Sequence, residues 1–239
     1  MVIAGGASKL AAGKVAHKLK AIAAQLMETT PDSITLENGW ARVSNSNQAT
    51  EIGVLARAAY HQSHRFKGLS PGLHENAVYD PGGTFSNACH IAMVEVDVET
   101  GGVRIERFIV VEDAGVLINP MIVDGQIAGG VAQGIANALF EEMIYDESGN
   151  LLTASFADYL PPTSAEVPEI EIIHMETASP ESLTKAKGVG EGGAIGAPAA
   201  VINAIVDALS PFGIQLFELP ATPQRIREQL RRAGVATYG

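Results

Sequence analysis

A single glutamate, Glu191, stands in a stretch of the chain that has almost no other side chains. Residues 187–193 read Lys-Gly-Val-Gly-Glu-Gly-Gly, and an apolar segment follows directly. If that segment begins a helix, its free backbone N–H groups can hold an anion, and Lys187 adds a positive charge. A carboxylate buried beside such a site becomes a usable general base. The alternative is that Glu191 only caps the helix, and the spacing alone does not separate the two roles.

The same glycines match a nucleotide-binding pattern, which their context excludes. Gly188, Gly190 and Gly193 have the Gly-x-Gly-x-x-Gly spacing of a dinucleotide fingerprint. That fingerprint must follow a hydrophobic strand directly and lead toward a second strand with an acidic residue. Here the polar loop 177–186 separates the expected strand over 169–176 from the glycines, and no such second strand follows. A nucleotide-binding domain is therefore rejected.

Composition narrows the classes of partner. The chain has 239 residues, of which 46% are hydrophobic and 18% charged, as in a globular protein that buries a core. Its formal net charge of −11 repels phosphate backbones and anionic lipid, so no nucleic acid partner is expected. One cysteine, Cys89, excludes an internal disulfide and an iron–sulfur cluster held by this chain alone. No membrane span or secretory signal is visible, and cytoplasmic localisation is expected.

Hydrophobic periodicity predicts an α+β fold in which helices and strands are interleaved irregularly. Val94, Val96 and Val98 alternate with acidic residues, which is typical of a half-exposed strand. No repeat or low-complexity linker divides the chain, so residues 1–239 are treated as one domain. The expected elements are helices over 7–28, 51–60 (capped by Thr50), 194–209 and 223–232 (capped by Thr222) and one that begins after Asn119-Pro120, with strands over 33–37, 40–43, 92–100, 103–113, 142–145, 151–156 and 169–176.

Several other residues receive structural rather than chemical interpretations. The helix after Asn119-Pro120 and the helix over 194–209 are rich in small residues, so both are expected to pack closely against other backbone. Cys89 is expected to be a small buried hydrophobe. His90 has no metal-ligand spacing in a periodic element, and Asp113 is expected to fix a turn.

Beyond these local patterns, the chain resembles a known family. The segment KGVGEGGAIGAPAAVINAIVDAL is similar to the C-terminal part of the molybdenum-bearing large subunit of the xanthine oxidase family, the molybdenum hydroxylases. More narrowly, it resembles the branch of carbon-monoxide-dehydrogenase-like large chains. Stretches such as VIAGGASKLAAG, INPMIVDGQIAGGVAQGIANALFEE and LPATPQRI agree in the expected order. The combination of Asn-Pro, Asp-Gly-Gln, Gly-Gly and Gln-Gly with Lys-Gly-Val-Gly-Glu is specific.

The resemblance implies roles for particular residues. Residues 1–239 would form the C-terminal molybdopterin-binding portion of such a subunit, with mixed sheets and packed helices. Glu191 matches the catalytic base, which takes the proton from the oxygen that attacks an electron-poor carbon. Gln126 matches a glutamine that contacts the pterin. No residue is predicted to ligate a metal. The backbone cradle beside the cofactor is expected at Lys187, Gly188, Val189 and Gly190.

The resemblance also implies cofactors and partners. The cofactor would be the molybdenum–molybdopterin cofactor, in its plain or cytosine dinucleotide form, with FAD and 2Fe–2S clusters on partner subunits. The expected partners are a chain carrying the N-terminal half of the molybdenum subunit, an iron–sulfur subunit, an FAD subunit and a small-molecule substrate. An aldehyde, an N-heterocycle or a related compound would be oxidised with water as the oxygen source.

An alternative follows from the cofactor segments that the family places upstream. Those segments are absent from this sequence, so the chain is expected to be either one half of a split subunit or a truncated product. The competing hypothesis is a noncatalytic assembly domain that keeps the fold without binding cofactor.

Overall fold

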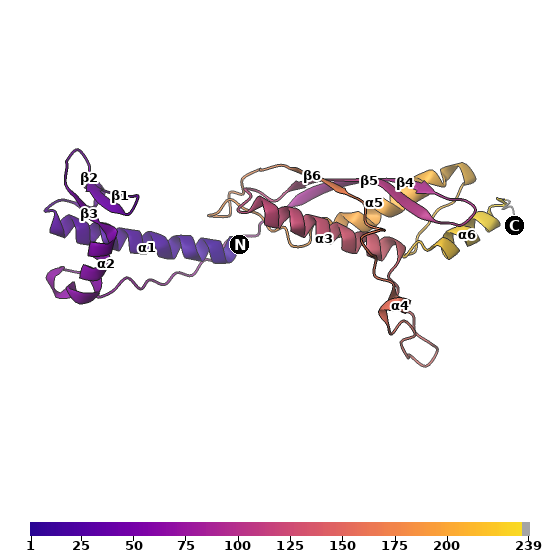
Figure 1. The fold of residues 1–239 in the computed structure, drawn as a ribbon, viewed down its shortest axis with the longest axis horizontal. Helices are drawn as coiled ribbons and strands as arrows, with labels where there is room; N and C mark the ends of the chain where they lie inside the picture. The colour runs from indigo at the N-terminus through magenta and orange to yellow at the C-terminus, as the bar shows by residue number, and fades with distance from the viewer. Residues whose placement is uncertain (236–239) are drawn as a thin grey trace. The chain divides into compact units, whose positions relative to one another are not determined.

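The computed structural model describes residues 1–235, which form two compact units (Figure 1). The first unit comprises residues 1–82 together with 182–184, and the second contains the remaining residues. Each unit has its own hydrophobic core. Assigning the whole range 1–239 to one molybdopterin-binding domain stays a prediction.

The first unit packs a small sheet and a second helix against the C-terminal half of a long helix. The core contains Ile22, Ile34 and Leu55, which are all nearly fully buried. The sheet is antiparallel in the order β1-β2-β3, and its first hairpin turns at Asn38 and Gly39, which both have positive φ. The elements are α1 (Val2–Leu26), η1 (Pro31–Ser33), β1 (Ile34–Glu37), β2 (Trp40–Val43), β3 (Ala49–Glu51), α2 (Ile52–His61) and η2 (Ser63–Arg65).

Two predictions for the first unit are wrong in their details. Helix α1 begins at Val2 rather than at residue 7, because the small residues before the expected start continue the helix. Thr50 does not cap α2. It lies in strand β3, opposite Ala41, and Glu51 occupies the N-cap position without a side-chain hydrogen bond. The third strand of this sheet has only three residues, too few for a hydrophobic period to be visible.

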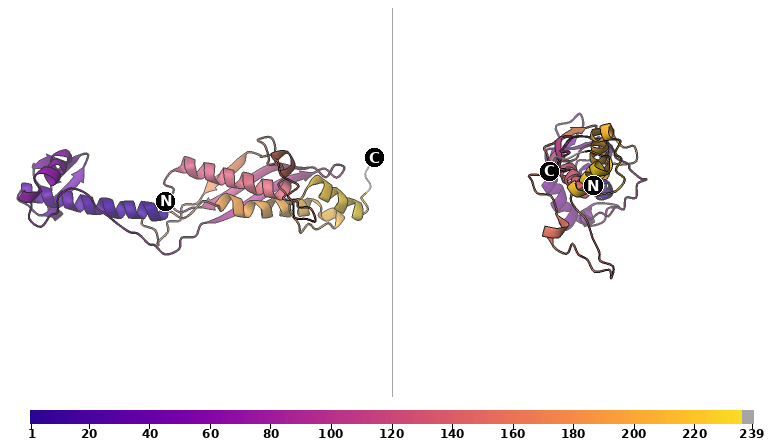
Figure 2. Two further views of the ribbon diagram at one scale, coloured as in Figure 1. Left: turned by 90° about the horizontal axis from the view of Figure 1, so that it is seen from below. Right: turned by 90° about the vertical axis from the view of Figure 1, so that its right-hand side faces the viewer.

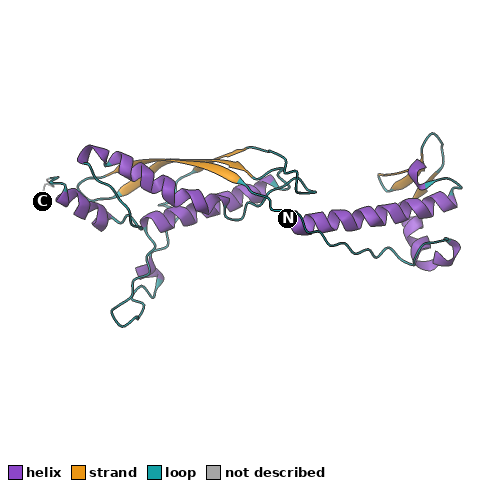
Figure 3. Cartoon of the chain, turned by 180° about the vertical axis from the view of Figure 1, so that it is seen from behind, coloured by secondary structure: helices purple, strands orange, loops and turns teal. Residues whose placement is uncertain are grey.

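The second unit is a three-stranded sheet with two long helices on one face (Figures 1 and 3). Strands β4 and β5 are antiparallel, and β6 pairs with β5 in parallel. Seen from below, α3 and α5 run side by side along the sheet (Figure 2). The elements are β4 (Asn87–Val96), β5 (Val103–Asp113), α3 (Pro120–Leu139), α4 (Phe156–Tyr159), β6 (Ile170–His174), α5 (Gly192–Ala208), η3 (Ser210–Phe212) and α6 (Pro223–Arg232).

Most predicted elements of this unit are confirmed. The hairpin of β4 and β5 is present, a helix follows Asn119-Pro120, and Thr222 caps α6. The structure adds that the side chain of Asn119 caps α3. The strands predicted over 142–145 and 151–156 are wrong, because only one isolated bridge, between Tyr145 and Leu151, forms there. No helix in the described part of the chain is long and apolar enough to cross a lipid bilayer.

Glycines allow helices α3 and α5 to approach until their backbones touch. A Cβ atom on Gly193 would lie 2.2 Å from the carbonyl oxygen of Ile127, and one on Gly130 would lie 2.8 Å from the backbone nitrogen of Ala194. Below these helices the core contains Phe108 and Val110 of β5, both fully buried. The expectation of close backbone packing for these two small-residue helices is confirmed.

We expect the substitution Gly130→Ala to destabilise the chain by about 1–3 kcal/mol, because the added methyl group overpacks a backbone contact that cannot yield. Gly129→Ala is the matched control. Its Cβ would meet no atom within 4 Å, and replacing a helical glycine with alanine stabilises by about 0.5–1 kcal/mol. Urea unfolding followed by circular dichroism measures both changes. Equal free energies of unfolding for the two variants would contradict this account of the packing.

Candidate active site

Glu191 stands at the N-cap position of α5, at the edge of a cavity of about 670 Å³. Its backbone carbonyl accepts hydrogen bonds from the N–H groups of Ala194 and Ile195. Its side chain is exposed, so the burial considered for this carboxylate is not found, and it makes no capping hydrogen bond. The interpretation of Glu191 as only a helix cap is therefore not supported, since the carboxylate is not used for capping.

The loop before Glu191 is open on its glycine side. Neither Gly188 nor Gly190 would bring a Cβ within 4 Å of another atom, and both line the same cavity as Glu191. Gln126 of α3 reaches this loop across 64 residues of sequence and donates from Nε2 to the carbonyl oxygen of Gly190, at 2.6 Å. Val189 packs instead against the core of the unit. The structure thus brings Gln126, Gly188, Gly190 and Glu191 together.

The side chain of Lys187 has a different role from the expected one. Its Nζ lies 3.1 Å from Oδ1 of Asp113, and its side chain is only 12% exposed. Its backbone N–H donates to the carbonyl oxygen of Ala114. The expectation that Lys187 adds positive charge to an anion site is wrong, because Asp113 already neutralises that charge. A contact between the Lys187 backbone and the cofactor stays a prediction.

Asp113 fastens the loop to the end of strand β5. Its Oδ1 accepts hydrogen bonds from the backbone N–H groups of Gly115, at 3.0 Å, and Thr177, at 3.2 Å. Burial by itself would raise the pKa of Asp113. The hydrogen bonds from Thr177, Gly115 and Lys187 together outweigh that effect and lower the pKa to about 2. The turn-fixing role expected for Asp113 is therefore confirmed.

Two residues of the cavity, His90 and Glu112, received no role from the sequence. Both lie on the helix-covered face of the sheet, where glycines of α5 leave room for them. A Cβ on Gly196 would lie 2.8 Å from Cδ2 of His90, and one on Gly192 would lie 2.7 Å from Oε1 of Glu112. The sequence did contain a pattern that could have indicated these two residues. Glu112 occupies an inward-facing position of a strand, and Gly192 and Gly196 are four residues apart, on one face of the helix that covers it.

Burial shifts the proton affinity of both groups toward the neutral form. Glu112 is fully buried, and burial raises its pKa; the negative charge of Asp113 raises it further, whereas His174 opposes the change. Burial lowers the pKa of His90. At the floor of the cavity, burial therefore favours the protonated, neutral form of Glu112 and the deprotonated, neutral form of His90.

The outer part of the cavity is more exposed and carries no cationic side chain. It includes Phe85, which is 83% exposed, and Ile195, which is 74% exposed.

The cysteine lies outside this cavity. Cys89 is exposed, so the expectation of a buried cysteine is wrong. Among residues 1–235 no group of three His, Cys, Asp or Glu side chains is placed to hold a metal ion.

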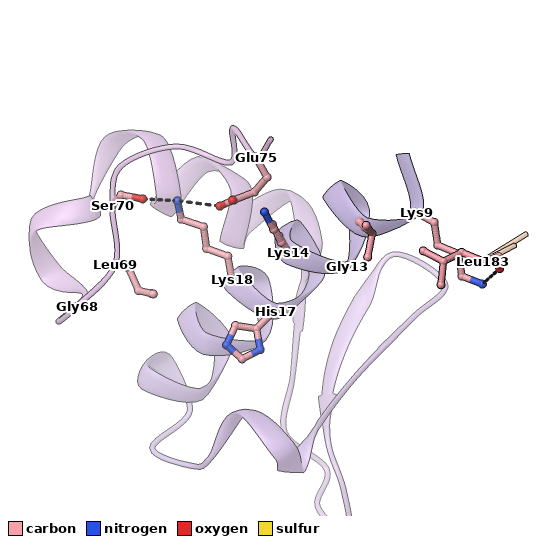
Figure 4. Close-up of a pocket in the computed structure, with 11 residues that line it drawn as sticks. Lys9, Gly13, Lys14, His17, Lys18, Gly68, Leu69, Ser70, Glu75 and Leu183 are labelled. Carbon is pink, nitrogen blue, oxygen red and sulfur yellow. Dashed lines mark hydrogen bonds and ion pairs between the residues drawn. The ribbon is translucent and has the colours of Figure 1, made fainter. Parts of the chain in front are cut away.

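A second cavity, of about 710 Å³, lies along α1 in the first unit (Figure 4). Its three lysine amines are already bonded within the chain. Lys18 donates to Ser70 at 2.9 Å, with Glu75 at 3.9 Å, while Lys14 and Lys9 donate to backbone carbonyls. These lysines join loops to α1, and the cavity has no comparable set of candidate catalytic groups.

Comparison with known proteins identifies the family. A family model described as a molybdopterin cofactor-binding domain matches residues 1–168. The chain belongs to this family. It is 47% identical, over 94% of its length, to the nicotine 6-hydroxylase large subunit of Paenarthrobacter nicotinovorans. It is 35% identical, over 98% of its length, to the carbon monoxide dehydrogenase large chain of Hydrogenophaga pseudoflava.

Solved structures agree with this assignment to the molybdopterin-binding family. The chain matches the quinoline 2-oxidoreductase of Pseudomonas putida 86 with a TM-score of 0.85 and 40% identity, over 91% of this chain and 28% of that one. It matches a Cu,Mo-CO dehydrogenase with a TM-score of 0.88 and 33% identity, over 97% and 29%. The chain spans 28% and 29% of the two curated relatives named above. The expected α+β fold of a molybdopterin-binding portion is confirmed.

We expect Asp113→Asn to destabilise the chain at neutral pH, since the loop loses its charged anchor. Because folding lowers the pKa of Asp113 from 3.8 to about 2, its stabilisation is fully present above pH 3.8 and is lost as the pH falls toward 2. The difference in free energy of unfolding between wild type and variant should therefore shrink over that range. Urea unfolding at a series of pH values measures it. A difference that stays constant from pH 6 to pH 2 would show that the Asp113 charge does not stabilise the fold.

Proposed function

We propose that this chain is the part of a molybdenum hydroxylase large subunit that contributes the catalytic base and one side of the molybdopterin site. The observation that carries the proposal is the position of Glu191. Its uncapped carboxylate stands at a cavity beside an open glycine loop, in a chain that belongs to the molybdopterin-binding family. In the noncatalytic alternative Glu191 is an ordinary exposed carboxylate, and the Glu191→Gln variant below separates the two.

The residues around the loop fit a pterin with a polar edge. Gly188 and Gly190 leave open space beside backbone groups, and Gln126 presents an exposed amide next to them. When bound, the molybdenum–molybdopterin cofactor supplies the two-electron chemistry and the oxygen for hydroxylation. In this proposal Gln126 and the loop backbone hold the cofactor, while Asp113 and Lys187 keep the loop in place.

Glu191 acts in the proposal as the proton acceptor. Its carboxylate oxygen takes the proton that is released when oxygen is transferred to an electron-poor carbon of the substrate. The side chain is anchored only through its own backbone at the start of α5. The helix therefore fixes the backbone of Glu191, and the bare glycines leave the approach to its carboxylate free.

The relatives favour an N-heterocycle as the substrate. Identity is higher to the nicotine 6-hydroxylase subunit, at 47%, and to quinoline 2-oxidoreductase, at 40%, than to the carbon monoxide dehydrogenase large chain, at 35%. We also propose that the chain belongs to a multisubunit complex, because these relatives are named as a large subunit and a large chain. It works there with the rest of the molybdenum subunit and with iron–sulfur and FAD subunits that carry the electrons away.

We expect Gln126→Ala to lower the cofactor content of the purified complex. Losing a hydrogen-bonding group at the pterin removes about 1 kcal/mol of binding free energy, which corresponds to about fivefold in affinity. Gln133→Ala is the matched control, because Gln133 is an exposed glutamine two turns further along the same helix than the residue that bonds to Gly190. Pterin and molybdenum are measured per chain. Equal contents in both variants would remove Gln126 from the cofactor site.

We expect Glu191→Gln to slow the reduction of the complex by substrate about a hundredfold to ten-thousandfold, because the amide cannot accept the proton. Molybdenum content should stay at the wild-type level, since the neighbouring loop contacts are made by backbone and by Gln126. Stopped-flow reduction of the cofactor-loaded complex by an N-heterocycle measures the rate. A fully loaded variant that is reduced as fast as wild type would refute the role of Glu191 as base.

A further inference from the structure

Helices α3 and α5 lie on one face of the sheet in the second unit (Figure 3), and the opposite face changes in character along the strands. Near the turn between β4 and β5, its outward positions are charged, and Arg104 pairs there with Glu95 and Glu106. In the middle of the sheet, Arg107 of β5 pairs with Glu171 of β6. Ion pairs of this kind are typical of a sheet face that is in contact with water.

Beyond the pair of Arg107 and Glu171, the same face is apolar. Cys89 of β4 pairs with Val111 of β5, and Val111 pairs with Ile173 of β6, which makes one row across the three strands. Ile91 and Ile109 form the next pair on β4 and β5. Ile91 is 48% exposed, Ile173 is 51% exposed, and Cys89 is exposed as well. We call Cys89, Ile91, Ile109, Val111 and Ile173 the outer patch.

Strand β5 is apolar on both of its faces at the outer patch. Residues 108–111 read Phe-Ile-Val-Val, and Phe108 and Val110 of this run are fully buried in the core of the unit. Continuous apolar runs are typical of strands that are covered on both faces, whereas a strand with one face in water alternates apolar and polar residues. The charged half of the sheet has polar outward positions and the outer patch does not. A contiguous exposed apolar surface of this kind marks a site of protein interaction.

The outer patch begins next to the cavity that contains Glu191. Asn87 and Ala88, which directly precede Cys89 on β4, both line that cavity and are both exposed. A protein segment that forms the other side of the cavity therefore lies next to the outer patch as well.

The length of the relatives and the charge of the chain favour one occupant for the outer patch. The chain spans 28% and 29% of the two curated relatives, so most of a subunit of that length lies outside these residues. The outer patch has no charged side chain with which to recognise a charged ligand. A second copy is disfavoured, because two chains with a net charge of −11 repel each other.

We propose that the outer patch is the surface on which the rest of the molybdenum subunit packs. This inference rests on the proposed function, because that function supplies the partner. The rest of the subunit covers the apolar half of the sheet with apolar side chains of its own, beside the cavity to which it contributes. The charged half of the same face stays in water.

The cysteine in the outer patch supplies the first test. Cys89 is the one cysteine of the chain, so its reactivity reports on the outer patch without any substitution. In the assembled complex Cys89 should lose its reaction with a maleimide, and it should regain that reaction when the complex is unfolded in urea. Mass spectrometry of the peptide that contains Cys89 measures both.

The matched control is Glu95→Cys combined with Cys89→Ser. It places a thiol at an exposed position of the same strand, in the charged half of the face. This thiol should react with the maleimide in the folded complex. A Cys89 that reacts in the folded complex as readily as the control thiol would overturn the proposal.

The second test identifies what covers the outer patch. Met93 is 54% exposed and pairs with Arg107 at the border of the patch, so benzoyl-phenylalanine introduced at Met93 probes the adjoining surface. Irradiation of the complex should crosslink Met93 to the rest of the molybdenum subunit, as read by mass spectrometry. A crosslink only to a second copy of this chain or only to the iron–sulfur or FAD subunit, or no crosslink, would overturn the proposal.

The third test compares Ile91→Lys with Glu95→Lys. Both variants place a lysine at an exposed position of β4, but only Ile91 belongs to the outer patch. Ile91→Lys should weaken association with the rest of the subunit at least about tenfold, because its charge enters an apolar interface without a partner. Glu95→Lys should associate as wild type does. Equal association of the two variants would overturn the proposal.

None of these measurements depends on turnover, so the two proposals can fail separately. A wild-type rate for Glu191→Gln refutes the proposed base and leaves the docking surface standing. A Cys89 that reacts freely in a complex whose Glu191→Gln variant is slow refutes the docking surface alone.

Discussion

The backbone contact between helices α3 and α5 is the constraint on which the second unit depends. Gly193 stands against the carbonyl of Ile127, and Gly130 against the nitrogen of Ala194. A contact without side chains fixes where α5 starts along α3. Gln126 consequently reaches the loop at Gly190. The position of Glu191 thus comes from helix packing rather than from bonds of its own side chain, and this leaves the carboxylate free for chemistry.

Strand β5 holds the same loop from the sheet side. Asp113 ends the strand and takes the charge of Lys187, while the backbone of Lys187 bonds to Ala114. The loop is therefore held by α3 through an amide and by β5 through an ion pair. Held from two elements, the backbone before Glu191 keeps its open glycine side available for a bound cofactor.

The buried polar side chains of His90, Glu112 and His174 destabilise the fold. Each unpartnered buried donor or acceptor costs about 1–3 kcal/mol, and His90, Glu112 and His174 contribute several such atoms. The glycines at 192 and 196 make room for two of these residues rather than excluding them.

The sequence by itself determined the features that depend on local patterns. The alternation of β4 and β5, the cap Thr222, the small-residue helices and the glycine loop around Glu191 are readable because each depends on neighbouring residues. The motif combination also determined the family, which the family model confirms.

Only the tertiary structure decided which distant groups meet. It paired Lys187 with Asp113 instead of with an anion, and its parallel pairing of β5 with β6 placed Glu112 beside His174. It also divided the described residues into two units and turned two predicted strands into an irregular loop. The physical reason is that partners far apart in the chain are set by strand register and by the closeness of helix packing. Neither of these leaves a periodic signal in the sequence around each residue.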